Sequence, residues 1–401
     1  MFRYYLKLGL LSIRANPALS SLMVAAIAIG IGACMTIMTI RHVMSDNPIA
    51  HKNDVLYHVQ VDNWNPADAY EDPDKPPEQL TYLDAKALHD AGRAYRQVTS
   101  YKTSRVVQPE GDEARPFQLD VRATTADFFP MFDVPFLYGT GWDGNSDSAL
   151  ERVAVLSRDL NQRLFGGEDS VGRMLTLNGE PYRIAGVLDE WNPVPKFYDL
   201  NNNPYEAPAE LFLPFSLAAT NGFDRDGNTS CWKPVEDGGF DRFLGSECIW
   251  IQMWVELRDP SEKDEYLQFL DAYVEEQKAL GRFARPLNNR LNTPAEWMAD
   301  REVVDDSVSV LLSIAVLFLV VCLLNTIGLL LAKIMRRAKD ISLRRALGAS
   351  RSALFAQHII EAGIIGAAGG LLGIVATWFG LRGIEQLYIE YDFIEHLVRM
   401  D

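Results

Sequence analysis

Three long stretches without a charged residue constrain this chain more than any other feature. They cover residues 18–40, 308–332 and 362–381. A helix needs about 20 apolar residues to cross the hydrocarbon core of a bilayer, and buried helices of soluble proteins rarely run uncharged for so long. The first stretch exceeds the apolar core of a signal peptide, and no A-x-A pattern follows it. We therefore predict three transmembrane helices at these positions.

Positive charge lies on one side of these predicted helices. Arg3, Lys7 and Arg14 precede the first, and seven Lys or Arg residues between positions 333 and 351 separate the second from the third. Lys and Arg accumulate in short cytoplasmic segments. Residues 333–361 are therefore expected to be cytoplasmic, and 41–307 and the tail 382–401 to lie outside the cytosol. Residues 1–17 are expected to form an amphipathic helix in the cytoplasmic headgroup layer.

The long segment 41–307 is predicted to be a large mixed α+β domain. Strand-like alternation at 55–64 and 249–257 accompanies helix-like segments at 81–92 and 261–281. The other predicted elements are a strand and helix at 152–167, with Ser157 as the cap, and a hairpin at 174–188, with Asn178-Gly179 at its tip. This segment carries a surplus of acidic residues, so nucleic acid is not an expected partner.

Four cysteines occur, two in predicted membrane helices and two in the external segment. Cys231 and Cys248 are 17 positions apart and would lie in an oxidising compartment, which favours a disulfide between them over two free thiols. Two cysteines without a nearby histidine fall short of the four ligands that zinc requires, so no metal site is expected. No pattern of catalytic residues stands out in the sequence.

Three blocks of sequence resemble one known family. They are SIRANPALSSLMVAAIAIGIGA near the N-terminus, TTADFFPMFDVPFLYGTGW with the following VAVLSRDLNQRLFGGEDSVGRMLTLNGEPYRIAGVL, and RRAKDISLRRALGASRSALFAQHIIEAGIIGAAGGLLGI after the second apolar run. In this order they resemble MacB-type permeases of the FtsX superfamily of ABC transporters. The resemblance implies a protein of the bacterial inner membrane whose periplasmic domain has two lobes. The lobe near the membrane would comprise about 43–125 and 250–305, and the distal lobe about 126–249.

The resemblance also implies partners. Members of this family dimerise and are driven by a separate cytoplasmic ATPase, which binds ATP and Mg²⁺, so the permease itself needs no cofactor. The chain has no G-x-x-x-x-G-K-[ST] motif of its own. A periplasmic adaptor and an outer-membrane channel are further expected partners. The family pattern has a fourth span where residues 382–401 stand, so either the sequence is truncated or this is a three-span member.

The short basic segment from Ile341 to Gly348 is the best candidate for contact with the ATPase. By resemblance this segment couples to the ATPase, and guanidinium groups bind carboxylates well. The alternative is that its charge only attracts anionic lipid. The residues assigned to coupling are Ile341, Leu343, Arg344, Arg345, Leu347 and Gly348.

A second group of candidates consists of small or polar residues within the apolar runs. Small residues allow helices to approach closely in lipid, and an amide can hydrogen-bond across helices, so packing within one subunit and dimerisation both remain open. Glu361 is expected at the membrane interface near a helix N-terminus, with a functional intramembrane acid as the alternative. The packing or dimerisation candidates are Gly30, Gly32, Asn325, Gly366, Gly370 and Gly373.

Two functions are consistent with these features. The first is a non-catalytic permease subunit that couples ATP hydrolysis by its partner to movement of the periplasmic domain, for efflux of a periplasmic substrate. The second is an FtsX-like regulator or sensor that transmits the state of the ATPase to an external enzyme or signalling partner. The sequence alone does not identify a substrate.

Overall fold

A computed structural model describes residues 16–109, 115–235, 238–348 and 350–387. The chain separates into two compact units, one formed by Met1–Asp46 with Val304–Asp401 and the other by Asn47–Val303. The first is called the helical unit below and the second the sheet unit. Residues 1–15 of the predicted amphipathic helix over residues 1–17 fall outside the described residues, as does most of the predicted tail, and Pro17 is the first residue of α2, which is introduced next.

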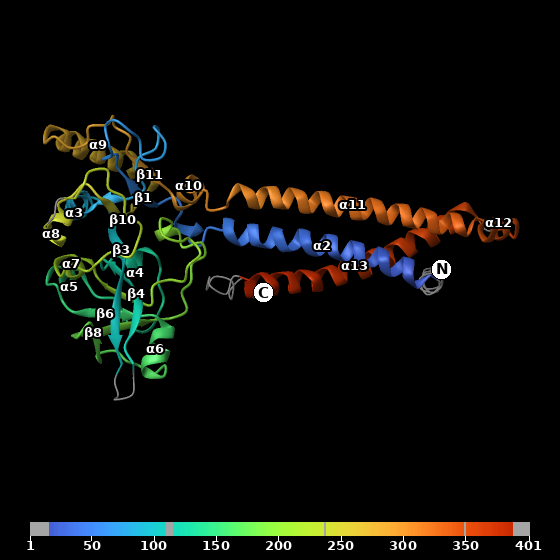
Figure 1. Ribbon diagram of the computed structural model, residues 1–401, viewed down its shortest axis with the longest axis horizontal. Helices are drawn as coiled ribbons and strands as arrows, with labels where there is room; N and C mark the ends of the chain where they lie inside the picture. The colour runs from blue at the N-terminus through green and yellow to red at the C-terminus, as the bar shows by residue number, and fades with distance from the viewer. Residues whose placement is uncertain (1–15, 110–114, 236–237, 349, 388–401) are drawn as a thin grey trace. The chain divides into compact units, whose positions relative to one another are not determined.

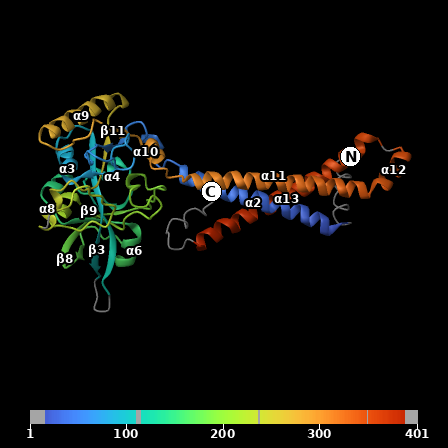
Figure 2. The same ribbon diagram turned by 45° about the horizontal axis from the view of Figure 1, so that its top comes forward.

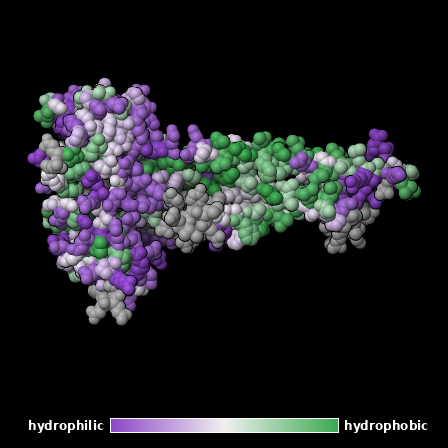
Figure 3. All heavy atoms as spheres, viewed as in Figure 1, coloured by the Kyte–Doolittle hydropathy of each residue, from purple (hydrophilic) through white to green (hydrophobic). Residues whose placement is uncertain are grey.

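The helical unit contains three long helices, α2 (Pro17–Ser45), α11 (Asp306–Arg336) and α13 (Arg351–Leu387). Each contains one predicted span and extends beyond it, and all three are long and apolar enough to cross a membrane. They run side by side in both ribbon views (Figures 1 and 2). Apolar side chains cover most of their surface, as Figure 3 shows in green. The prediction of three membrane helices is confirmed.

The sheet unit is built on one mixed sheet. Among the described residues, eleven strands contribute to it, in the order β11-β1-β10-β3-β4-β9-β6-β8-β5, with β2 on β10 and β7 on β3 and β8. The strands are β1 Leu56–Gln60, β2 Leu80–Thr81, β3 Arg96–Gln108, β4 Phe117–Thr124, β5 Phe136–Gly139, β6 Val153–Leu156, β7 Met174–Leu177, β8 Glu180–Leu188, β9 Leu211–Pro214, β10 Ile249–Glu256 and β11 Arg290–Asn292.

Most neighbouring strands of this sheet are antiparallel, whereas β4–β9 and β6–β8 are parallel. The pairing of β4 with β9 joins strands from 43–125 and 250–305 to strands from 126–249. The two predicted lobes therefore share one continuous sheet. Their assignment as lobes stays a prediction.

Helices cover both faces of the sheet. Alternate residues of a strand point to opposite faces, so Trp254 of β10 joins one core while Met253 and Val255 join the other. The helices and short 3-10 turns are η1 Ala50–Lys52, α3 Tyr82–Asp90, α4 Phe128–Met131, α5 Gly144–Ser148, α6 Arg158–Phe165, η2 Phe197–Asp199, α7 Phe215–Thr220, α8 Phe240–Leu244, η3 Pro260–Glu262, α9 Lys263–Ala279 and α10 Pro294–Asp300.

Several local predictions for the sheet unit are confirmed. Helix α3 begins after Thr81, whose hydroxyl accepts from the backbone N–H of Asp84, and Ser157 caps α6 in the same way. The hairpin β7–β8 turns at Asn178-Gly179, where both residues have positive φ. The mixed α+β fold class is confirmed together with the three membrane helices.

Candidate functional site at one end of the helical unit

The basic segment between α11 and α13 folds as a helix, a break and a helix. Helix α12 (Ala338–Ala346) follows α11 after Arg337. Gly348 has φ of +97°, a left-handed conformation that glycine adopts without the steric cost of a side chain. The hydroxyl of Ser350 then accepts from the backbone N–H of Ala353 at 3.2 Å, which caps the start of α13. The segment therefore has a defined elbow.

The elbow presents apolar and cationic side chains together. Leu343 of α12 is 62% exposed, and Leu347, which directly follows the helix, is 80% exposed. Arg345 is also exposed, whereas Ile341 is half-buried. Arg344 donates from Nη1 to Oε1 of Gln357 on α13 at 3.2 Å, which ties α12 to the next helix. The coupling role of these residues stays a prediction.

A buried cluster of polar groups lies just inside this elbow. Nζ of Lys333 on α11 is 2.5 Å from Oε1 of Glu361 on α13 and donates to the hydroxyl of Ser20 on α2 at 3.3 Å. Nδ1 of His358 is 3.8 Å from the other carboxylate oxygen of Glu361. Lys333, Glu361 and Ser20 are each at most 3% exposed. One ion pair and one hydroxyl therefore join all three long helices.

This cluster corrects one expectation from the sequence. Glu361 does not lie near a helix N-terminus, because α13 already begins ten residues earlier, at Arg351. Lys333, which the sequence places among the loop cations, is part of α11 and is buried. The signal that sequence reasoning missed is a pair of opposite charges at the facing ends of two apolar runs.

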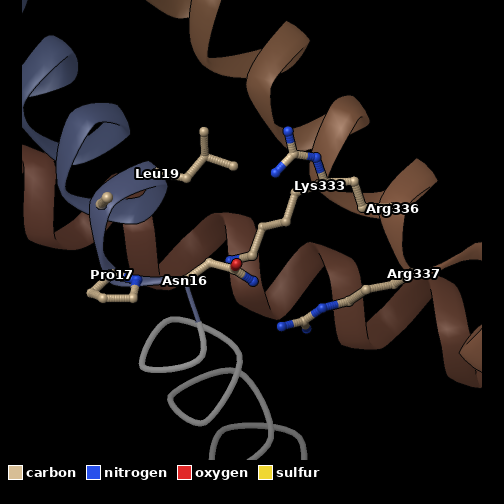
Figure 4. Close-up of a pocket in the computed structure, with 7 residues that line it drawn as sticks. Asn16, Pro17, Leu19, Lys333, Arg336 and Arg337 are labelled. Atoms are coloured by element: carbon tan, nitrogen blue, oxygen red, sulfur yellow. The ribbon is translucent and has the colours of Figure 1, made fainter.

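A cationic cavity of about 350 Å³ opens beside the cluster. Figure 4 shows Lys333 directed toward Asn16, Arg336 directed toward Leu19, and Arg337 directed toward the start of α2. Helix α2 begins without a side-chain cap. Cations and an uncapped helix start give this cavity a positive potential.

The glycine candidates separate into two groups. Gly30 packs against Leu319 and Cys322 of α11, and Gly32 packs against Ala376 of α13. Gly373 packs against Ile31 of α2. At each of these positions a Cβ atom would lie 2.9 Å or less from its nearest neighbour. These three glycines bring the helices of one chain close together.

Gly366, Gly370 and Asn325 do not take part in this packing. A Cβ at either glycine would meet nothing within 4 Å. Asn325 is exposed on α11, and its side chain has no hydrogen bond within the described part of the chain. These three residues remain candidates for contacts outside the subunit.

The polar groups of the sheet unit serve its folding. Within the described ranges, no group of three or more His, Cys, Asp or Glu side chains could hold a metal ion. A disulfide joins Cys231 to Cys248. Arg122 and Lys196 converge on the buried carboxylate of Asp199, and burial lowers the pKa of Lys196 to about 8. This network fixes the loop that follows β8 against the sheet.

Two family models and several known proteins match the sequence of this chain. Residues 20–271 match the model of the MacB-like periplasmic core domain, and residues 312–397 match the FtsX-like permease C-terminal model. The macrolide export ATP-binding/permease protein MacB of Rhodospirillum rubrum is 24% identical, over 92% of this chain and 51% of that protein. The uncharacterized ABC transporter permease YknZ of Bacillus subtilis is 21% identical, over 95% of this chain and 87% of that protein.

A solved structure is also similar in part. The periplasmic region of MacB from Actinobacillus actinomycetemcomitans matches with 12% identity and a TM-score of 0.38, over 62% of this chain and 94% of that one. The chain spans about half the length of the Rhodospirillum rubrum relative.

Proposed function

Because the chain belongs to the MacB/FtsX family of ABC transporter permeases, we propose that it is the permease subunit of a mechanotransmitting transporter. In this proposal a cytoplasmic ABC ATPase supplies the energy, and the elbow between α11 and α13 receives it. The three long helices then transmit movement to the extracytoplasmic sheet unit. The chain acts without catalytic chemistry of its own.

The exposed elbow is the observation that carries this proposal. The side chains of Leu343 and Leu347 are mostly exposed beside those of Arg344 and Arg345. Apolar side chains flanked by guanidinium groups suit a protein groove lined by carboxylates. The Arg344–Gln357 hydrogen bond would carry a push on α12 into α13. Apolar and cationic side chains together also suit a lipid surface, so the charge-reversal experiment below is designed to distinguish the two contacts.

Charge reversal at the elbow tests the ATPase contact. Replacing Arg344→Glu with Arg345→Glu is expected to lower ATPase binding at least tenfold, because like charges would oppose each other across the interface. The measurement is co-purification with the ATPase and stimulation of ATP hydrolysis in proteoliposomes. The matched control is Lys339→Glu with Arg351→Glu, which changes the net charge of the same segment by the same amount. Equal loss in both double variants would indicate a general charge effect and contradict a specific contact.

The proposed transport activity is efflux of a substrate captured outside the cytosol. It draws on the family and on relatives named for macrolide export and pyoverdine export. A second permease subunit, a periplasmic adaptor and an outer-membrane channel complete the proposed assembly in the inner membrane. Cells that lack the chain should retain more of a candidate export substrate. An unchanged export profile, together with altered activity of an external hydrolase, would favour an FtsX-like regulator instead.

A further inference from the structure

The cationic cavity between the start of α2 and the end of α11 has the size of a small-ligand site. Its volume is about 350 Å³, and pockets that bind small molecules typically measure about 300–1,000 Å³. The apolar run of α2 starts at Ala18 and that of α11 stops at Ala332, so the cavity lies where both helices leave the hydrocarbon region. The positive-inside rule places this end of the helices in the cytoplasmic headgroup layer. The cavity is therefore expected at the depth of lipid phosphate groups.

The positive charge of the cavity is not fully neutralised within the described part of the chain. Lys333 is paired with Glu361. Arg336, by contrast, is exposed, and its side chain has no ion pair or hydrogen bond with any described residue. Seven described residues line the cavity, none of them acidic, and they are Asn16, Pro17, Ala18, Leu19, Lys333, Arg336 and Arg337.

Backbone donors at the start of α2 add to this potential. Pro17 occupies the first turn, and no side chain caps the helix. The first hydrogen bond described within the helix runs from the N–H of Ser20 to the carbonyl of Asn16, at 3.1 Å. The N–H groups of Ala18 and Leu19 come before it and, as at any helix start, point out of the helix, where they can donate to an anion.

The buried ammonium of Lys333 supplies a further donor. An ammonium has three N–H groups, and its partners among the described residues are Oε1 of Glu361 and the hydroxyl of Ser20. Lys333 is only 3% exposed, and Figure 4 shows its side chain directed toward Asn16 on the wall of the cavity. A buried donor without an acceptor is costly, so an oxygen atom of a ligand in the cavity would satisfy the third N–H.

We propose that this cavity binds a phosphate group, held by the guanidinium of Arg336, the ammonium of Lys333 and the N–H groups that begin α2. A guanidinium can donate two parallel hydrogen bonds to phosphate, and basic pockets between membrane helices hold anionic headgroups. The apolar wall at Ala18 and Leu19 suits the glycerol portion of a phospholipid, so a lipid is the expected source of the phosphate and the free ion is the other source. The site is separate from the segment Ile341–Gly348 and does not depend on the proposed ATPase contact.

Native mass spectrometry of the full chain in detergent tests the site. Phosphatidylglycerol, phosphatidylcholine with the same acyl chains and inorganic phosphate are added in separate titrations. One phosphatidylglycerol should bind per chain, about tenfold more tightly than phosphatidylcholine, whose choline offsets the phosphate charge. Arg336→Gln with Arg337→Gln should weaken this binding about 10- to 30-fold. The matched control, Lys339→Gln with Arg351→Gln, removes two positive charges from exposed residues of the same segment that do not line the cavity.

A second pair of variants tests the cavity without changing its charge. Ala18→Trp fills part of the cavity and should prevent tight binding of phosphatidylglycerol. Leu22→Trp places the same ring one turn further along α2, at an exposed position outside the cavity, and should bind the lipid normally. An unchanged rate of reaction of Cys322 with a thiol reagent verifies in each variant that the helices stay packed.

Each outcome decides the proposal. Binding of inorganic phosphate but of neither lipid, with a loss in the Arg336 and Arg337 double variant, would support the site and assign the free ion as its ligand. Equal affinity for the two lipids, or equal losses in both double variants, would mean that diffuse surface charge attracts lipid and would overturn the proposal. Tight binding that survives Ala18→Trp would overturn it as well, because the ligand would then lie elsewhere. The ATPase contact is tested separately, through Arg344 and Arg345.

Discussion

Arg122 and Asp199 in the sheet unit, and Lys333 and Glu361 in the helical unit, are buried ion pairs in very different surroundings. Asp199 also accepts from Gln252 and lies 3.6 Å from the ammonium of Lys196. Lys333 is held by Glu361 and by the hydroxyl of Ser20. A folded domain in water can surround a buried charge with loops and alternative partners. Three helices in lipid offer fewer such groups, and here the further neighbour is the ring of His358, 3.8 Å from Glu361.

The difference indicates where the molecule is sensitive to change. In the sheet unit, charge is spread over a network that tolerates the loss of one member. In the helical unit, one pair joins α11 to α13 close to the elbow that is proposed to receive force. The same type of substitution should therefore have unequal effects in the two units.

The largest expected effect follows from Lys333→Met. The carboxylate of Glu361 would lose its ammonium partner inside the bundle, and breaking a buried pair costs about 3–5 kcal/mol. Arg122→Met should cost less, about 2 kcal/mol, because Lys196 stays beside Asp199. The rate at which Cys322 reacts with a thiol reagent reports opening of the helical unit, because Cys322 is buried against α2. Unfolding of the sheet unit is followed by tryptophan fluorescence.

A double variant separates lost pairing from lost packing. Lys333→Met with Glu361→Met removes both charges and should recover most of the stability lost in the single variant. If the double variant is as unstable as Lys333→Met alone, side-chain packing rather than the ion pair explains the loss.

The local elements of the sheet unit could be predicted because their signals lie within a few residues of each other. Thr81 and Ser157 cap the helices that follow them, and Asn178-Gly179 supports the left-handed backbone of a tight turn. Strands β3 and β4 were not among the predictions. They are long and central, and β3 carries polar residues along its length. Their pairing depends on contacts distant in the sequence.

The Lys333–Glu361 pair could not be predicted from local patterns. Lys333 stands at the edge of an apolar run, where charge is expected to mark the cytoplasmic interface. Only the length of α13, which begins at Arg351, places Glu361 deep enough in the bundle to meet Lys333. Packing in three dimensions shows that Lys333 is a buried partner of Glu361 and not merely a marker of the cytoplasmic interface.

A smaller effect is expected from pH in the sheet unit. His58 is buried between Trp254 and Trp297, and burial lowers its pKa to about 3. Below pH 6.5 the unfolded chain binds a proton at this residue that the folded one excludes. The contribution of His58 to stability should therefore fall by about 2 kcal/mol between pH 7 and pH 5. Tryptophan fluorescence in a denaturant series at each pH measures this dependence.

Glu78 acts in the opposite direction across this range, with a contribution of similar size. Burial raises its pKa to about 7, so its stabilising contribution is present at low pH and is lost as the pH rises toward 7. The variant His58→Phe keeps a ring against Trp297 without a titrating group. The difference between the two pH profiles isolates the contribution of His58, and identical profiles would contradict it.

The smallest effect concerns glycines that differ in their surroundings within one helix. Gly373→Ala places a methyl group 2.8 Å from Ile31 on α2, so the helices must separate slightly, at a cost of about 1 kcal/mol. Gly370→Ala, three residues earlier, meets open space and should leave Cys322 reactivity unchanged. Gly373→Ala alone is expected to raise the rate at which Cys322 reacts with the thiol reagent, by roughly fivefold. Equal falls in both would mean that helix propensity, which alanine raises, rather than the contact with α2, governs stability here. A rise for Gly370→Ala alone would place the critical contact on the open side of α13, outside the subunit.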